Sequence, residues 1–126
     1  MKHAAIHVAL SAALILGPAA ARCEPAAAPD LSPAFGNTIV STHPDGRKAR
    51  LFIHADHTYA AQSRAGSRSG GTWTIKGQKL CLSQKQPHPG LFTFCKTVPP
   101  VALGHPWSDT AVTGERVTNE VVKGEN

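Results

Sequence analysis

The chain has 126 residues and a formal net charge of +5 at neutral pH. This length allows one domain and excludes a multidomain architecture. The basic residues are unevenly spread, because positions 47 to 96 hold nine Lys and Arg against one acid, Asp56. A basic face of this kind can attract an anionic surface or an acidic envelope protein. The simpler interpretation is a solvated face that keeps a small protein soluble.

The N-terminus has the features of a secretory signal. Lys2 supplies a positive n-region, residues 4–16 are mostly apolar, and small residues lead to Ala21. We therefore predict a signal peptide over residues 1–21 and an exported protein, periplasmic or secreted. The apolar run is shorter than the roughly 20 residues that a membrane span needs, so no spanning segment is expected. Arg22 argues against a lipoprotein signal ending at Cys23. Export also makes nucleic acid an unexpected partner.

Residues 22–34 are rich in Pro and Ala and predict a mobile linker. Residues 35–126 then show short runs of β-branched and aromatic residues, separated by turn residues at a spacing of about ten. The predicted strands are 37–42, 48–54, 58–64, 72–76, 79–84, 92–98, 110–113 and 116–123. The expected fold is all-β: a small antiparallel meander that closes into a barrel of about eight strands, since closure hides the sheet edges.

Hairpin geometry assigns one buried face. A turn at 43–46 pairs Val40 with Ala49, a three-residue turn at 55–57 pairs Ile53 with Tyr59, and a two-residue turn at 77–78 pairs Trp73 with Leu82. These registers direct the following residues inward: Val40, Leu51, Ile53, Tyr59, Trp73, Ile75, Leu80, Leu82, Phe92 and Phe94. Ile39 and Phe52 are apolar exceptions on the outer face.

Two cysteines face each other in this register. Centring the next hairpin on His88 places Cys81 opposite Cys95 on the outer face. Export implies an oxidising compartment, so we predict one disulfide between them. A closed loop of about 15 residues stabilises by on the order of 3 kcal/mol in the chain-entropy description. Cys23 is left over, either as a free thiol or as a bridge to another chain.

Several short motifs have a familiar order. Phe35-Gly36-Asn37-Thr38, Pro44-Asp45-Gly46, Gly71-Thr72-Trp73 and Leu80-Cys81 followed by Cys95 resemble a loose group of short exported bacterial proteins of undefined function. The resemblance covers about residues 35 to 98 and implies a small lipocalin-like β-barrel without implying an activity. The turn that often reads Asp-Gly in that group is Asp56-His57 here.

Histidines at one end of the predicted barrel are the candidate metal ligands. An up-and-down order brings His54, Asp56, His57 and His105 together, and imidazole with a carboxylate can hold Zn²⁺ or Cu²⁺. The competing interpretation, which we favour, treats all four as solvated turn residues, and no cofactor is expected.

No catalytic residues are predicted, and the chain is not expected to be an enzyme. Gly66-Ser67-Arg68-Ser69-Gly70 has Arg68 where a nucleophile elbow has serine, and Ser63 to Gly71 is expected to be a flexible basic loop. Trp107 lies among prolines and is either an anchor for a partner or a plug for the barrel end.

Three functions remain open, and no ligand-binding residues are assigned for any of them. The first is an exported cell-envelope binding or interaction module that engages an envelope protein or an anionic surface. The second is a lipocalin-like carrier of a small apolar ligand. The third is an inhibitor of a protease or a lysozyme.

Overall fold

The computed structural model describes residues 13–15, 17 and 27–125. Cys23 and most of the predicted signal peptide lie outside these residues. The strands are β1 (Thr38–Thr42), β2 (Lys48–Ile53), β3 (Thr58–Gln62), β4 (Arg68–Lys76), β5 (Lys79–Gln86), β6 (Thr93–Thr97), β7 (Trp107–Thr110) and β8 (Arg116–Val122). A short 3₁₀ helix, η1 (Ser32–Ala34), precedes them. No helix among the described residues is long and apolar enough to cross a membrane.

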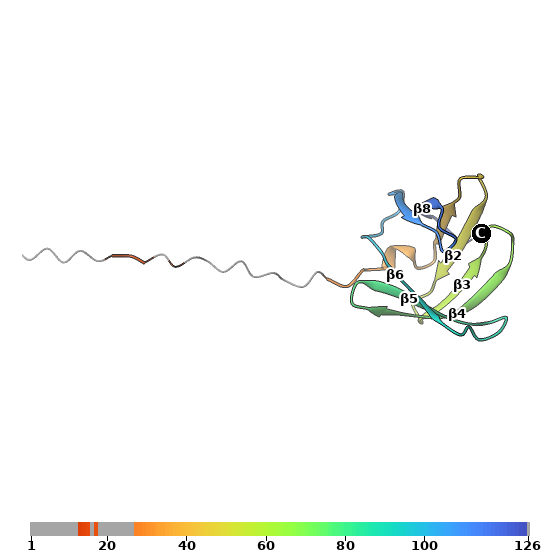
Figure 1. The fold of residues 1–126 in the computed structure, drawn as a ribbon, viewed down its shortest axis with the longest axis horizontal. Helices are drawn as coiled ribbons and strands as arrows, with labels where there is room; N and C mark the ends of the chain where they lie inside the picture. The colour runs from red at the N-terminus through yellow and green to blue at the C-terminus, as the bar shows by residue number, and fades with distance from the viewer. Residues whose placement is uncertain (1–12, 16, 18–26, 126) are drawn as a thin grey trace, which may run out of the picture.

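The strands form one antiparallel sheet in the order β6-β5-β4-β3-β2-β1-β8-β7. This order is a meander in which β8 returns to pair with β1, and the sheet curls into a half-barrel (Figure 1). The predicted all-β class and the eight antiparallel strands are confirmed. The curl leaves β6 and β7 as the two edges of the sheet, and we call the gap between them the seam.

The two ends of the half-barrel are built differently. The turns His43–Arg47, Ser63–Ser67 and Ala111–Glu115 and the loop 87–92 lie at the end that we call the open end. The turns at 54–58 and 77–78 lie at the other, closed end, which η1 helps to fill. Leu31 and Ala34 at η1 are buried in the core. The packed region therefore begins at Leu31 rather than at Phe35, and the last part of the predicted linker belongs to the domain.

One hairpin register differs from the sequence prediction. Thr42 pairs with Lys48, which places Ile39 opposite Leu51. The turn at 43–47 contains one residue more than expected, because Gly46 with φ 81° closes a tight turn and adds a bulge. This shift directs Ile39 into the core and turns Val40 outward, which reverses the predicted assignment of these two residues.

The remaining inner face follows the predicted registers over most of its length. The buried core consists of Leu31, Ala34, Ile39, Ile53, Tyr59, Trp73, Leu80, Val101 and Val121. The predicted placement of Phe92 in the core is wrong, because the β5–β6 ladder ends at Ser83 and Thr93 and leaves Phe92 86% exposed. Phe94 pairs with Leu82 as expected, but it is half-exposed because no strand covers it beyond β6.

Two strands differ from their predicted ranges by more than two residues. β4 begins at Arg68, so the predicted flexible loop from Ser63 to Gly71 is shortened to the turn Ser63–Ser67. The predicted strand at 110–113 is displaced to β7, and residues 111–115 form the turn to β8. In both places a glycine with positive φ, Gly66 or Gly114, closes the turn.

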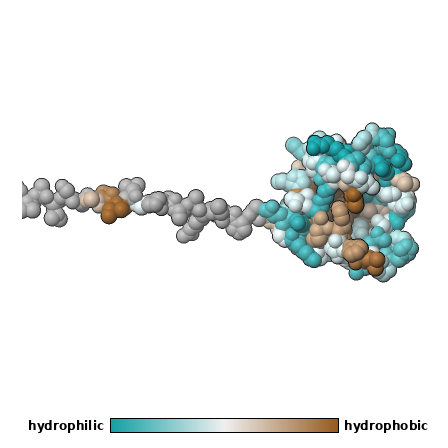
Figure 2. All heavy atoms as spheres, viewed as in Figure 1, coloured by the Kyte–Doolittle hydropathy of each residue, from teal (hydrophilic) through white to brown (hydrophobic). Residues whose placement is uncertain are grey.

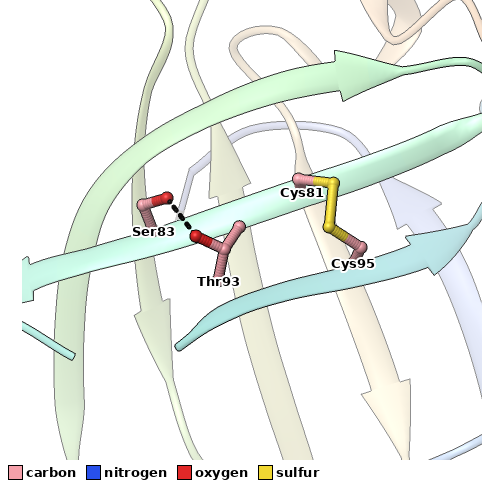
Figure 3. Close-up of a disulfide and its surroundings, with 4 residues drawn as sticks. All are labelled: Cys81, Ser83, Thr93 and Cys95. Atoms are coloured by element: carbon pink, nitrogen blue, oxygen red, sulfur yellow. Dashed lines mark hydrogen bonds between the residues drawn. A yellow bond between two sulfur atoms is a disulfide. The ribbon is translucent and has the colours of Figure 1, made fainter. Parts of the chain in front are cut away.

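The predicted disulfide joins Cys81 of β5 to Cys95 of β6, with their Cα atoms 4.0 Å apart (Figure 3). The two residues pair directly in the ladder. They lie on the face opposite Leu80 and Leu82, as the register predicts. Cys81 is nevertheless buried, whereas Cys95 is exposed. β6 is an edge strand with one hydrogen-bonded neighbour, so the disulfide anchors the strand that borders the seam.

Candidate functional site

A cavity of about 370 Å³ lies inside the half-barrel and reaches the seam. Its lining comes from both edges of the sheet and from the strands between them. The apolar lining includes Ile39, Leu51, Leu82, Phe94, Val98 and Trp107. Figure 2 shows a hollow in the visible face of the domain with apolar atoms at its floor. Ligand pockets in proteins commonly have volumes of about 300–1,000 Å³ with mainly apolar walls, so this cavity has the size and the chemistry of a small-molecule site.

The seam exists because of how the chain connects β6 to β7. Residues 98–106 cross the closed end, and Gly104 N donates a hydrogen bond to Val121 O. β7 then pairs with β8 alone, so β6 and β7 face each other without a backbone ladder between them in the described sheet. Side chains span the gap instead. Lys96 Nζ of β6 lies 2.9 Å from Asp109 Oδ1 of β7 and also donates to Thr110 O.

A charged cluster lies where three open-end turns meet at the rim of the cavity. Arg64 Nη1 lies 2.7 Å from Glu115 Oε1, and His43 Nδ1 lies 2.9 Å from the same oxygen. His43 Nδ1 also lies 3.2 Å from Arg64 Nη1, so the imidazole contacts both members of the ion pair. His43 and Arg64 also line the cavity, so the cluster supplies polar groups to an otherwise apolar site.

The pKa of Glu115 is lowered to about 2. The hydroxyl of Thr113 contributes most, followed by the backbone N–H of Glu115 itself and the His43 ring, while the Arg64 guanidinium adds a smaller coulombic effect. Asp45 in the neighbouring turn also has a lowered pKa, mainly because it accepts from the backbone N–H of Arg47. Both carboxyl groups are therefore ionised at neutral pH.

The charges at the cavity are balanced. Glu115 pairs with Arg64, and Asp109 pairs with Lys96. The other polar lining groups include Ser41 and Asn119, whose side chains hydrogen-bond to each other. A charged ligand would have to displace one of these ion pairs, whereas an uncharged ligand would not.

A second hollow, of about 480 Å³, has a different character. It lies beside β3 and β4 and is lined in large part by polar residues, among them Gln62, Arg68, Ser69 and Gln84. The two hollows share Ser41, Ala49, Leu51 and Ser63, so they adjoin each other, and the part at the seam contains most of the apolar residues.

The closed end is filled by a tryptophan and the turn that covers it. Trp73 is 6% exposed, and its Nε1 donates to His54 O at 2.8 Å. The His57 ring stacks on Trp73 with the ring centroids 4.3 Å apart. His57 has φ 68° and occupies the position that Gly46 and Gly66 occupy in the equivalent turns at 43–47 and 63–67. The stacking contact explains why a residue other than glycine occupies this position.

The predicted metal ligands do not form a site among the described residues, where no three His, Cys, Asp or Glu side chains are grouped as a metal would need. His54 contacts Thr58 and Glu125, Asp56 accepts from the backbone and hydroxyl of Thr58, and His57 stacks on Trp73. His105 is exposed in the crossing segment. Three of the four residues therefore serve the turn at the closed end.

Sequence reasoning did not identify the charged cluster. The predicted turn at 43–46 contains His43, but no local pattern links Arg64 to Glu115, because they are 51 positions apart in the chain. The signal that could have found them is the repeated turn pattern: His43, Ser63 and Ala111 each open the same five-residue turn. Since alternate turns of a meander lie at one end, their polar residues meet there. Trp107, predicted as an anchor or a plug, is half-buried and lines the cavity.

Comparisons with family models, curated proteins and solved structures found no match to this chain. The resemblance to small exported barrels therefore stays a prediction.

Proposed function

We propose that this protein is an exported carrier that binds a small, uncharged and predominantly apolar molecule in the cavity at the seam. The observation that carries the proposal is the cavity itself, about 370 Å³ in volume and lined mainly by apolar side chains. Of the three functions left open by the sequence, a carrier is the one that requires such a cavity. A carrier of this kind needs no catalytic group.

The electrostatics support an uncharged ligand. Removing an ionised group from water costs several kcal/mol unless it gains a partner, and the cationic groups at the cavity are already paired with carboxylates. A neutral molecule with one hydroxyl or carbonyl group would find hydrogen-bonding partners at the rim, where His43, Ser63 and Arg64 lie. The apolar body of the ligand would contact Leu82, Phe94 and their neighbours.

The disulfide supports the compartment. Disulfides persist in oxidising environments such as the periplasm and the extracellular space, and Cys81–Cys95 holds the strand that borders the seam. An apolar molecule has low solubility in the water of the periplasm or the extracellular space. A protein cavity open along one side is therefore a suitable means of carrying it.

The test is a fluorescence titration with N-phenyl-1-naphthylamine, a neutral apolar probe that brightens when it leaves water. We expect saturable binding to the processed wild-type protein at one site. Ala49→Phe places a ring into the cavity that Ala49 lines and should weaken binding by at least roughly tenfold, because the ring occupies ligand volume.

The matched control is Ala60→Phe. Ala60 pairs with Phe52 on the outer face of the sheet, so the same substitution there should leave probe binding unchanged. Competition adds a test of charge, since dodecanol should displace the probe at lower concentration than laurate. Binding that is absent in the wild type, or that both variants weaken equally, would overturn the proposal.

A further inference from the structure

The exposed large apolar side chains of the domain are confined to one part of the chain. Within residues 27–125, five such residues are exposed, and all of them lie between positions 91 and 112: Leu91, Phe92, Phe94, Leu103 and Val112. This stretch includes β6, the crossing segment and β7. Four of the five lie in or next to the strands that border the seam, whereas Leu103 lies in the segment that crosses the closed end. In Figure 2 an apolar patch also lies on the outer surface near the hollow.

The most exposed pair lies in the loop between β5 and β6, directly before the first residue of β6. Leu91 is 92% exposed and Phe92 is 86% exposed. Neither residue belongs to a strand, so nothing in the sheet requires apolar side chains at these positions. Two adjacent large apolar residues that are this exposed are available for contact with another apolar phase.

Unpaired cations flank the same end of the half-barrel. Lys48, Arg68, Lys85 and Arg116 are exposed and lie at or next to the strand ends beside the open-end turns. None of them forms an ion pair with another described residue. The carboxylates of these turns, Asp45 and Glu115, are already paired with arginine. The open end therefore has a net positive charge.

We infer that the open end docks on an anionic lipid bilayer, with Leu91 and Phe92 inserted among the acyl chains and the flanking cations against the headgroups. Interfacial membrane binding scales with the buried apolar area and with attraction to anionic lipids, and both features are present at this end. The positive charge disfavours a second copy of the chain as the occupant, because two such ends would repel each other.

Docking on a membrane is distinct from ligand binding, and the residues that would mediate it lie outside the cavity floor. Docking is linked to the proposed function, because it would bring the rim of the cavity close to the bilayer. This rim includes Val112 and Phe94. An apolar ligand could then pass between membrane and cavity with little exposure to water.

The experiment is sedimentation of the processed protein with vesicles. One set contains phosphatidylcholine alone, and the other contains about one third phosphatidylglycerol, so that only the second set carries negative charge. We expect binding to the anionic vesicles and a decrease of that binding with added salt. Leu91→Ser/Phe92→Ser should reduce the fraction bound by at least roughly tenfold, because it removes the inserted apolar area.

The matched control at the same positions is Leu91→Met/Phe92→Leu, which retains apolar side chains and should bind nearly as well as wild type. Arg68→Gln/Lys85→Gln should weaken binding to the anionic vesicles, whereas Lys76→Gln/Lys79→Gln at the closed end should not. All variants share one N-terminus, so any contribution from the residues before the domain is common to them.

Three outcomes would overturn the inference. They are no preference for anionic vesicles, equal binding by the serine and the conservative variants, and a concentration-dependent dimer in sedimentation velocity that the serine variant abolishes. The last outcome would assign the patch to a second copy of the chain. The cavity variant Ala49→Phe should still bind vesicles, so a failure of the carrier proposal can be told apart from a failure of this one.

Discussion

The same strands form both ends of the half-barrel, but the closed end has a packed interior and the open end has a cavity. At the closed end, Trp73, the His57 ring and η1 with its buried Leu31 leave little unfilled space. At the open end, the interior is a cavity, and the polar groups at its rim are held by ion pairs rather than by packing. The comparison indicates that stability is concentrated at one end, which allows the other to remain unfilled.

The largest expected effect concerns Trp73. Trp73→Ala should lower the free energy of unfolding by about 3–5 kcal/mol, because it leaves a void in the packed end and removes the hydrogen bond from Nε1 to His54 O. Urea denaturation followed by circular dichroism measures the change. Trp107→Ala, at the cavity wall, provides the comparison and should cost distinctly less. Equal losses for the two variants would remove the distinction between the ends.

The next largest effect concerns the Cys81–Cys95 disulfide. Cys81→Ala/Cys95→Ala should cost about 3 kcal/mol, since opening a loop of about 15 residues releases chain entropy in the unfolded state. Reductant should lower the denaturation midpoint of wild type toward that of the variant and leave the variant itself unchanged. If reductant breaks the bond in wild type but leaves the denaturation midpoint unchanged, the bond does not stabilise this edge strand.

A smaller effect separates backbone strain from stacking at His57. His57→Ala loses the contact with Trp73 and keeps a Cβ at φ 68°, whereas His57→Gly loses the contact but relieves the backbone. The alanine variant should therefore be less stable than the glycine variant by about 1 kcal/mol. Thermal melts of the two proteins measure the difference, and an alanine variant as stable as the glycine variant would contradict the strained turn.

The smallest effect concerns the charged cluster. The folded pKa of Glu115 is about 2, below its ordinary value of 4.5. Its stabilisation is therefore present above pH 4.5 and is lost as the pH falls toward 2. Stability measured across this range should fall more steeply for wild type than for Glu115→Gln. Parallel pH profiles for the two proteins would show that the cluster contributes nothing to folding.

Much of the fold could be predicted from the sequence, and the failures have specific physical causes. The register that joins Trp73 to Leu82 is confirmed because a two-residue turn determines it. The register that joins Cys81 to Cys95 is also confirmed, although the loop 87–92 between β5 and β6 is longer. The β1–β2 register is wrong by one residue because Gly46 allows a bulged turn, and a shift of one residue exchanges Ile39 and Val40 between the two faces.

The candidate site was less predictable than the fold. The seam depends on how residues 98–106 cross the closed end, and no local pattern in that segment specifies whether β6 and β7 pair. Alternation along the strand predicts Phe92 and Phe94 in a closed core, whereas the open seam leaves Phe92 exposed and Phe94 half-exposed. Arg64 and Glu115 meet only through the three-dimensional arrangement of the turns.

The central claim is that the closed end is filled and that the open end binds a ligand. Its most direct test is a two-dimensional NMR titration of the processed, ¹⁵N-labelled protein with dodecanol. We predict that amide shifts will change at the cavity wall, in β6, β7 and the turn Ala111–Glu115, while those of Leu31, Tyr59 and Trp73 stay nearly constant. Saturable shifts centred on the closed end, or no saturable shifts in any segment, would contradict the account.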